Sequence, residues 1–197
     1  MNIKNLALGV LVAGFVASCG TTETKVENVT LSADTKASTI EWRGEENDLH
    51  FHTGTIALKE GELIMNGDSV VSGKFVVDMN SIDAKTEGYP AEKMAYLNLH
   101  LRDSTIFNVA KFPTATVTVL GYKNGKIDAE FEVLGVKMKQ EVPAKLTSTA
   151  TSATLAADFQ LNITDAKIPF AQVINPETSL PALNPNLTFK INLVLKK

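Results

Sequence analysis

An alternation of apolar and polar residues with a period of two runs through most of the chain. No other sequence feature limits the possible folds as strongly. The clearest runs occupy residues 75–79, 127–133, 155–161 and 187–195. Successive side chains of a β-strand point to opposite faces, so each run predicts a strand with one buried face. Many antiparallel strands at short spacing predict an all-β barrel or sandwich, and a closed barrel leaves no strand edge exposed.

One stretch, about residues 90–108, departs from this alternation. Pro90 suits the first position of a helix, and Met94, Leu97 and Leu101 then recur at helical spacing. We therefore predict an antiparallel β-barrel of about eight strands with one short helical insertion.

The first 19 residues have the pattern of a bacterial lipoprotein signal. Lys4 precedes an uncharged apolar run that is shorter than the roughly 20 residues of a membrane-spanning helix. Val16-Ala17-Ser18-Cys19 resembles the lipobox, in which the cysteine is diacylated after cleavage. The alternative is an ordinary secretory signal that leaves an unpaired cysteine. We predict a signal peptide over residues 1–18.

The lipid signal predicts a stable membrane attachment, because two or more acyl chains hold a protein firmly. Cys19 would anchor the chain through a flexible tether over residues 19–36, although Val29-Thr30-Leu31 could add a short strand. The barrel domain would then occupy residues 37–197. No Asp follows Cys19 directly, which favours the outer membrane of the cell envelope.

Charge and motifs exclude several classes of function. The net charge is −3 without a basic cluster, which argues against nucleic acid as a partner. The sequence contains no phosphate loop, dinucleotide fingerprint or Gly-x-Ser-x-Gly elbow. We therefore predict no catalytic residue and no cofactor, and the oligomeric state stays open.

Several segments, in order along residues 38–195, resemble the YceI-like family of polyisoprenoid-binding proteins. The matching segments are Ser38-Thr39-Ile40-Glu41-Trp42-Arg43-Gly44, His52-Thr53-Gly54, Gly73-Lys74-Phe75-Val76-Val77-Asp78-Met79 and, most specifically, Lys111-Phe112-Pro113-Thr114-Ala115. Ile106 stands where many members have a phenylalanine, and the position stays apolar. The resemblance implies a lipocalin-like barrel around an elongated apolar cavity, which in some members holds an isoprenoid chain or a fatty amide.

The apolar positions of the alternating runs define a candidate ligand-binding wall. It consists of Phe75, Val77, Met79, Val117, Val119, Phe131, Phe159, Leu161, Phe189 and Ile191. Trp42 is predicted to pack in the core. A barrel of about eight strands can be filled by side chains or can hold one small ligand. We predict binding or transport of an amphiphilic, lipid-like molecule. The alternative is a filled barrel that serves as an envelope interaction or stress-related module.

Three histidines are the candidate polar groups. His50 and His52 are two residues apart, so both should point to one face of a strand, and His100 lies on the predicted helix. His52, in the His-x-Gly segment, and His100 are predicted to contact the head group of the ligand. The alternative is that one or two of the histidines make structural hydrogen bonds beside the pocket. Three histidines could also bind zinc or serve a hydrolase, but no recognised pattern completes such a site, and we predict no metal.

Overall fold

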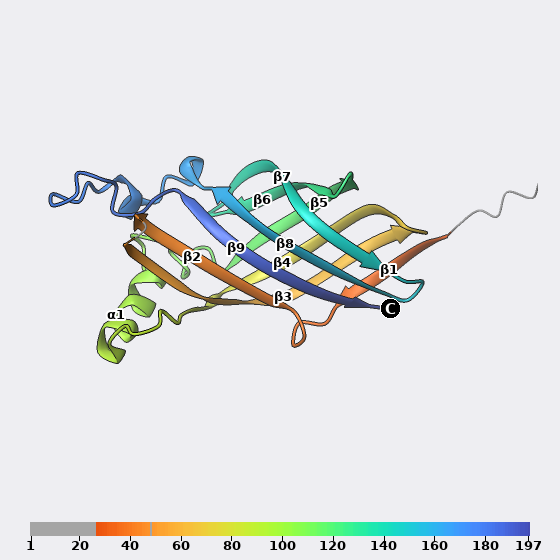
Figure 1. The fold of residues 1–197 in the computed structure, drawn as a ribbon, viewed down its shortest axis with the longest axis horizontal. Coiled ribbons are helices and arrows are strands. Elements are labelled where there is room, and N and C mark those ends of the chain that lie inside the picture. Colours follow the sequence, from red (N-terminus) through yellow and green to blue (C-terminus); the bar gives the residue numbers. More distant parts are fainter. Residues whose placement is uncertain (1–26, 48) are drawn as a thin grey trace, which may run out of the picture.

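The computed structural model describes residues 27–47 and 49–197, which are built mainly of antiparallel strands (Figure 1). The predicted signal peptide and Cys19 lie outside these residues. No helix in the described part of the chain has the length and apolar character needed to cross a bilayer. The elements are β1 (Asn28–Ala33), β2 (Thr39–Asn47), β3 (His50–Asn66), β4 (Ser69–Ala84), α1 (Ala91–Arg102), β5 (Thr114–Lys123), β6 (Lys126–Val133), β7 (Val136–Ser148), β8 (Ser152–Asn162), the 3-10 turns η1 (Thr164–Ala166) and η2 (Pro169–Gln172), and β9 (Asn186–Lys196).

The nine strands close into a barrel of eight positions. Around the ring the order is β3, β2, β9, β8, β7, β6, β5 and β4, and the pairing of β4 with β3 closes it. β1 and β2 share one position, because each pairs with both β3 and β9, at different heights. The predicted barrel with one helical insertion is confirmed. All ladders lie within residues 28–196.

The barrel begins earlier in the chain than the sequence predicts. The predicted tether runs to residue 36, but β1 lies inside that range and pairs with β3 from Asn28 to Ser32. The reason is Leu31, whose side chain is 1% exposed. Full burial of a leucine stabilises a fold by about 1.5–3 kcal/mol. The short strand suggested by Val29-Thr30-Leu31 is therefore present, and any tether ends before it.

Apolar side chains fill the end of the barrel where β1 lies. Leu31 of β1 stands opposite Leu63 of β3, and Leu195 of β9 stands opposite Ala153 of β8. All four are buried, and so is Met65 of β3. These five side chains, which we call the floor, close this end of the barrel. A ligand would have to enter at the opposite end.

α1 is held against β4 at a bulge in that strand. Relative to β3, β4 carries extra residues here, and a bulge leaves backbone groups without ladder partners. The Arg102 guanidinium donates hydrogen bonds to the carbonyls of Asn80 and Ile82. The Asn98 side-chain oxygen accepts a hydrogen bond of 2.7 Å from the Ala84 N–H. Side chains of α1 thus supply hydrogen-bond partners to backbone groups of β4 at and beside the bulge, and these bonds fix the position of the helix.

Three segments gather at the end opposite the floor (Figure 1): the turn between β2 and β3, α1, and the connection between β8 and β9. We call this connection the 163–185 loop. Its Asn184 N–H donates to the Glu45 carbonyl at 2.7 Å, and its Phe170 N–H donates to the Thr105 carbonyl at 2.9 Å. These bonds attach the loop to β2 and to the segment after α1. We call this end the mouth.

Replacing Leu31 with Ala should lower the free energy of unfolding by about 2–5 kcal/mol, the usual cost of a Leu→Ala cavity in a core. Urea unfolding of residues 20–197 measures the change. Val71→Ala is the control, because Val71 is 45% exposed and should cost about 0.5 kcal/mol or less. Equal, small effects of the two substitutions would contradict the place of β1 in the barrel.

Candidate functional site

The barrel contains a cavity of about 920 Å³. Its lining includes Leu49 and Tyr96, whose side chains are exposed at the surface, so the cavity reaches solvent at the mouth. None of the floor residues lines it. The volume lies near the top of the range of roughly 300–1,000 Å³ that small-molecule sites occupy.

All ten apolar residues of the predicted wall line this cavity. Those that are buried are Phe75, Met79, Val119, Phe131 and Leu161. The others are partly exposed because they face the cavity: Val77, Val117, Phe159, Phe189 and Ile191. The interior is therefore not filled. The alternative of a solid barrel would require a filled interior. Contact of these residues with a ligand stays a prediction.

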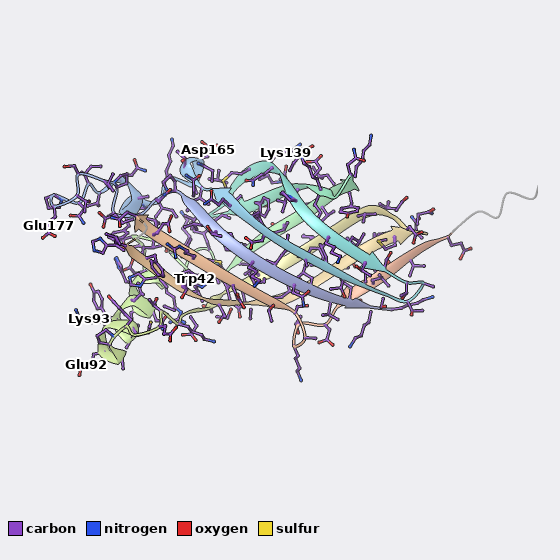
Figure 2. The ribbon with its side chains drawn as sticks, viewed as in Figure 1. Trp42, Glu92, Lys93, Lys139, Asp165 and Glu177 are labelled. Atoms are coloured by element: carbon purple, nitrogen blue, oxygen red, sulfur yellow. The ribbon has the colours of Figure 1, made fainter. Side chains whose placement is uncertain are left out.

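Aromatic rings form a row along one side of the cavity. The ring centroids of Phe131 and Phe159 are 5.7 Å apart, and those of Phe159 and Phe189 are 5.8 Å apart. Trp42, which is labelled in Figure 2, stands opposite Phe189 in the ladder between β2 and β9. A Cβ atom on Gly54 would lie 2.5 Å from the Trp42 ring, so the glycine of the His-x-Gly segment makes room for it. Trp42, predicted as a core residue, also lines the cavity.

His52 lies at the mouth and is partly buried. Its Nδ1 is 3.2 Å from the Thr86 hydroxyl oxygen, and its ring meets the Tyr89 ring edge-on with centroids 4.8 Å apart. Burial lowers the pKa of His52, because a charged imidazolium loses hydration there. His52 can thus present a neutral ring to the cavity, able to donate or accept one hydrogen bond.

His100 also lines the mouth. Its Nδ1 lies 2.9 Å from Asp103 Oδ2, and its ring meets the edge of the Phe170 ring at a centroid distance of 5.0 Å. Hydrogen bonds from the Thr105 hydroxyl and from His100 lower the pKa of Asp103 to about 2. The carboxylate therefore stays charged and orients the His100 ring beside the 163–185 loop.

His50 and Glu46 connect the β2–β3 turn to the 163–185 loop. His50 Nδ1 is 3.8 Å from a Glu46 carboxylate oxygen. The same carboxylate accepts hydrogen bonds from the Thr178 hydroxyl and from the Asn175 amide, the latter at 3.1 Å to each oxygen. The hydrogen bond from Thr178 is the main cause that lowers the pKa of Glu46. His50 and His52 both line the cavity, but so does Phe51 between them, so the lining does not test the prediction that the two histidines share a face.

The three histidines are not brought together. His50 contacts Glu46, His52 contacts Thr86 and His100 contacts Asp103. Across residues 27–47 and 49–197, no group of three or more His, Cys, Asp or Glu side chains is arranged to hold a metal ion.

Positive charge is scarce around the cavity. Arg43 is the single lysine or arginine among the described lining residues. Its Nε is 2.7 Å from Glu45 Oε2, and its guanidinium lies over the Phe51 ring at 3.7 Å. Glu87 adds a negative charge to the lining. The site has little to offer an anionic group.

Sequence reasoning missed the contribution of the 163–185 loop. Phe170, Ala182 and Leu183 of this loop line the cavity. A signal was available: prolines 169, 176, 181 and 185 interrupt the alternation, and the connection is too long for a hairpin loop. It carries no periodic pattern, however, so nothing in the sequence shows that it folds over the mouth.

A family model of the YceI-like domain matches residues 31–195. Two solved structures share the fold. The polyisoprenoid-binding domain from Saccharophagus degradans implicated in plant cell wall breakdown is 18% identical, with a TM-score of 0.63 over 84% of this chain and 97% of that domain. BcnA of Burkholderia cenocepacia is 13% identical, with a TM-score of 0.58 over 82% of this chain and 98% of that one. No functionally curated protein matches the chain significantly in sequence.

Acid should destabilise the barrel through His52. Because the folded state disfavours the protonated ring, it binds fewer protons than the unfolded chain as the pH falls below about 6.5. The stability due to the neutral ring is complete above this pH and is lost toward the lower folded-state pKa. When the pH falls from about 7.5 to about 5, the free energy of urea unfolding should therefore decrease more for the wild type than for His52→Gln.

The difference in the free energy of unfolding between the wild type and His52→Gln at the higher pH controls for the effect of the substitution itself. An NMR titration that places the pKa of His52 at or above about 6.5 would contradict this prediction.

Proposed function

Because the chain belongs to the YceI-like family, we propose that it binds an amphiphilic molecule of the isoprenoid or fatty-acid type inside its barrel. The observation that carries this proposal is the apolar cavity of about 920 Å³ with its closed floor. Burial of a hydrocarbon tail there would contribute about 25 cal/mol per Å² of apolar surface. The likeness in fold to a polyisoprenoid-binding domain supports the same ligand class.

The tail would lie along the aromatic row and the head group at the mouth. Polar lining groups occur at that end, among them His52, Thr86 and His100, and a few such groups can fix the orientation of a ligand. Arg43 is already paired with Glu45, and the cost of burying an unpaired charge is high. We therefore propose an uncharged head group, such as an alcohol or an amide.

We further propose that the protein is a lipid-anchored carrier of the cell envelope, attached to the outer membrane through Cys19. The lipobox-like segment Val16-Ala17-Ser18-Cys19 supports this, and attachment would hold the carrier near a source of lipid-like ligand. We infer binding and delivery rather than catalysis, with no nucleic acid as partner.

Native mass spectrometry of residues 20–197, purified without detergent, tests the proposed ligand. We expect an added non-covalent mass that disappears under denaturing conditions. Phe159→Trp should reduce the uptake of an added long-chain fatty amide, because the larger ring occupies cavity volume. Phe112→Trp is the matched control, since Phe112 is partly buried but does not line the cavity. A bare protein mass that fatty amide and isoprenoid alcohol leave unchanged would reject the proposal.

Replacement of Cys19 with Ser tests the proposed anchor. The wild-type full chain, expressed in a bacterium, should enter the detergent phase of a phase-separation assay and carry the added mass of its acyl groups. Cys19→Ser should remain in the aqueous phase without that mass. An unmodified Cys19 in the wild type would show that the segment is an ordinary secretory signal.

A further inference from the structure

Large exposed apolar side chains concentrate at the mouth. Of the eight such side chains in the described residues, Val71 and Leu120 lie on the strands β4 and β5. The other six belong to the three segments around the mouth. They are Leu49 in the β2–β3 turn, Tyr96 and Leu99 on α1, and Val173, Ile174 and Leu180 in the 163–185 loop. We call these six the mouth rim.

The mouth rim is continuous with the cavity wall. Leu49 and Tyr96 belong to both, with exposures of 87% and 70%. Leu180 is separated by one residue from Ala182, which lines the cavity. A ring of apolar side chains around the entrance of an apolar cavity marks an interaction surface rather than a scatter of single residues.

The charges beside the mouth rim narrow the kind of surface that it fits. Glu87 lines the cavity, Glu92 and Lys93 lie on α1, and Glu177 lies in the 163–185 loop (Figure 2). The acidic groups would not be drawn to an anionic membrane, which attracts clusters of basic residues. An electrically neutral, zwitterionic lipid surface would meet the apolar rim without this repulsion. Tyr96 is the type of side chain that favours a membrane interface.

The position of β1 determines which membrane the mouth can meet. β1 begins at the floor end (Figure 1), and residues 20–27 can span at most about 28 Å between Cys19 and β1. β3 has 17 residues, which correspond to roughly 40 Å along the barrel axis at the usual strand tilt. The tether is therefore too short to bring the mouth head-on to the bilayer that holds Cys19.

We propose that the mouth rim docks on a zwitterionic phospholipid bilayer other than the one that carries the Cys19 anchor. The tail of a ligand could then pass between bilayer and cavity without contact with water. This inference rests on the proposed carrier function and adds the surface from which the ligand is taken or to which it is given.

Vesicle co-sedimentation tests the docking. Residues 20–197 should bind vesicles of phosphatidylcholine and phosphatidylethanolamine, with little dependence on salt. The double substitution Leu99→Ser and Ile174→Ser, at two rim residues that do not line the cavity, should weaken binding about tenfold or more, because two apolar side chains no longer enter the lipid. The matched control is Val71→Ser with Leu120→Ser, whose side chains are exposed on the barrel wall. It should bind as the wild type does.

Three results would overturn the docking proposal. They are no binding by the wild type, equal losses in both double variants, and binding to anionic vesicles alone that salt abolishes. Sedimentation velocity adds a fourth, a rim-dependent dimer without vesicle binding, which would make a second copy of the chain the occupant.

Uptake of a fatty amide from detergent solution separates this inference from the carrier function. Uptake without vesicle binding leaves the carrier function standing and rejects the docking. Vesicle binding without uptake rejects the carrier function and leaves the docking standing. The rim variant should keep its uptake, because neither Leu99 nor Ile174 lines the cavity.

The choice of bilayer needs the lipidated full chain. Incorporated in one vesicle population through Cys19, it should bridge to a second population and raise light scattering. The rim variant should not bridge. Absence of bridging by a wild type that is anchored and binds vesicles would show that the mouth meets its own membrane, against the proposal.

Discussion

The closure of the strand ring by the ladder between β3 and β4 is the constraint on which the rest of the structure depends. The closed ring of eight positions surrounds more space than its inward side chains fill, so a cavity remains along part of its length. The closing ladder contains the bulge of β4, where backbone groups need hydrogen-bond partners from outside the ladder. Arg102 and Asn98 of α1 supply those bonds. Barrel closure and helix position are thus parts of one arrangement.

The two ends of the barrel differ because different parts of the chain reach them. β1 extends the position of β2 and brings Leu31 to the floor, where it meets Leu63. At the mouth, no strand continues, and the 163–185 loop is held instead by side chains such as Glu46. The apolar closed end and the polar groups that line the cavity at the mouth, inside the apolar rim, would give an amphiphile a single favourable orientation. The same asymmetry places the start of β1 and the entrance at opposite ends.

Much of the fold and of the wall could be predicted because both follow from local patterns. In a strand, successive side chains point to opposite faces, so the position in the sequence sets the face. The ten wall residues were therefore assigned to the right face without any knowledge of the neighbouring strands. β1 was underestimated because its apolar content is small, and its burial depends on β3 and β9, which are distant in sequence. Trp42 was predicted as a core residue and is buried, but alternation alone does not show whether such a ring also faces a cavity.

The sequence by itself determined that the described chain consists mainly of strands with one apolar face, since period-two alternation is a local property of the backbone. The closure of these strands into one barrel depends on pairing between distant segments, such as β3 with β4. Only the tertiary structure decided that the interior holds a cavity rather than a solid core. The enclosed volume depends on how many strands close the ring and how they tilt, and no single segment carries that information. The mouth was likewise decided by tertiary structure, because His100 meets Phe170, and His52 meets Thr86, through contacts between separate elements.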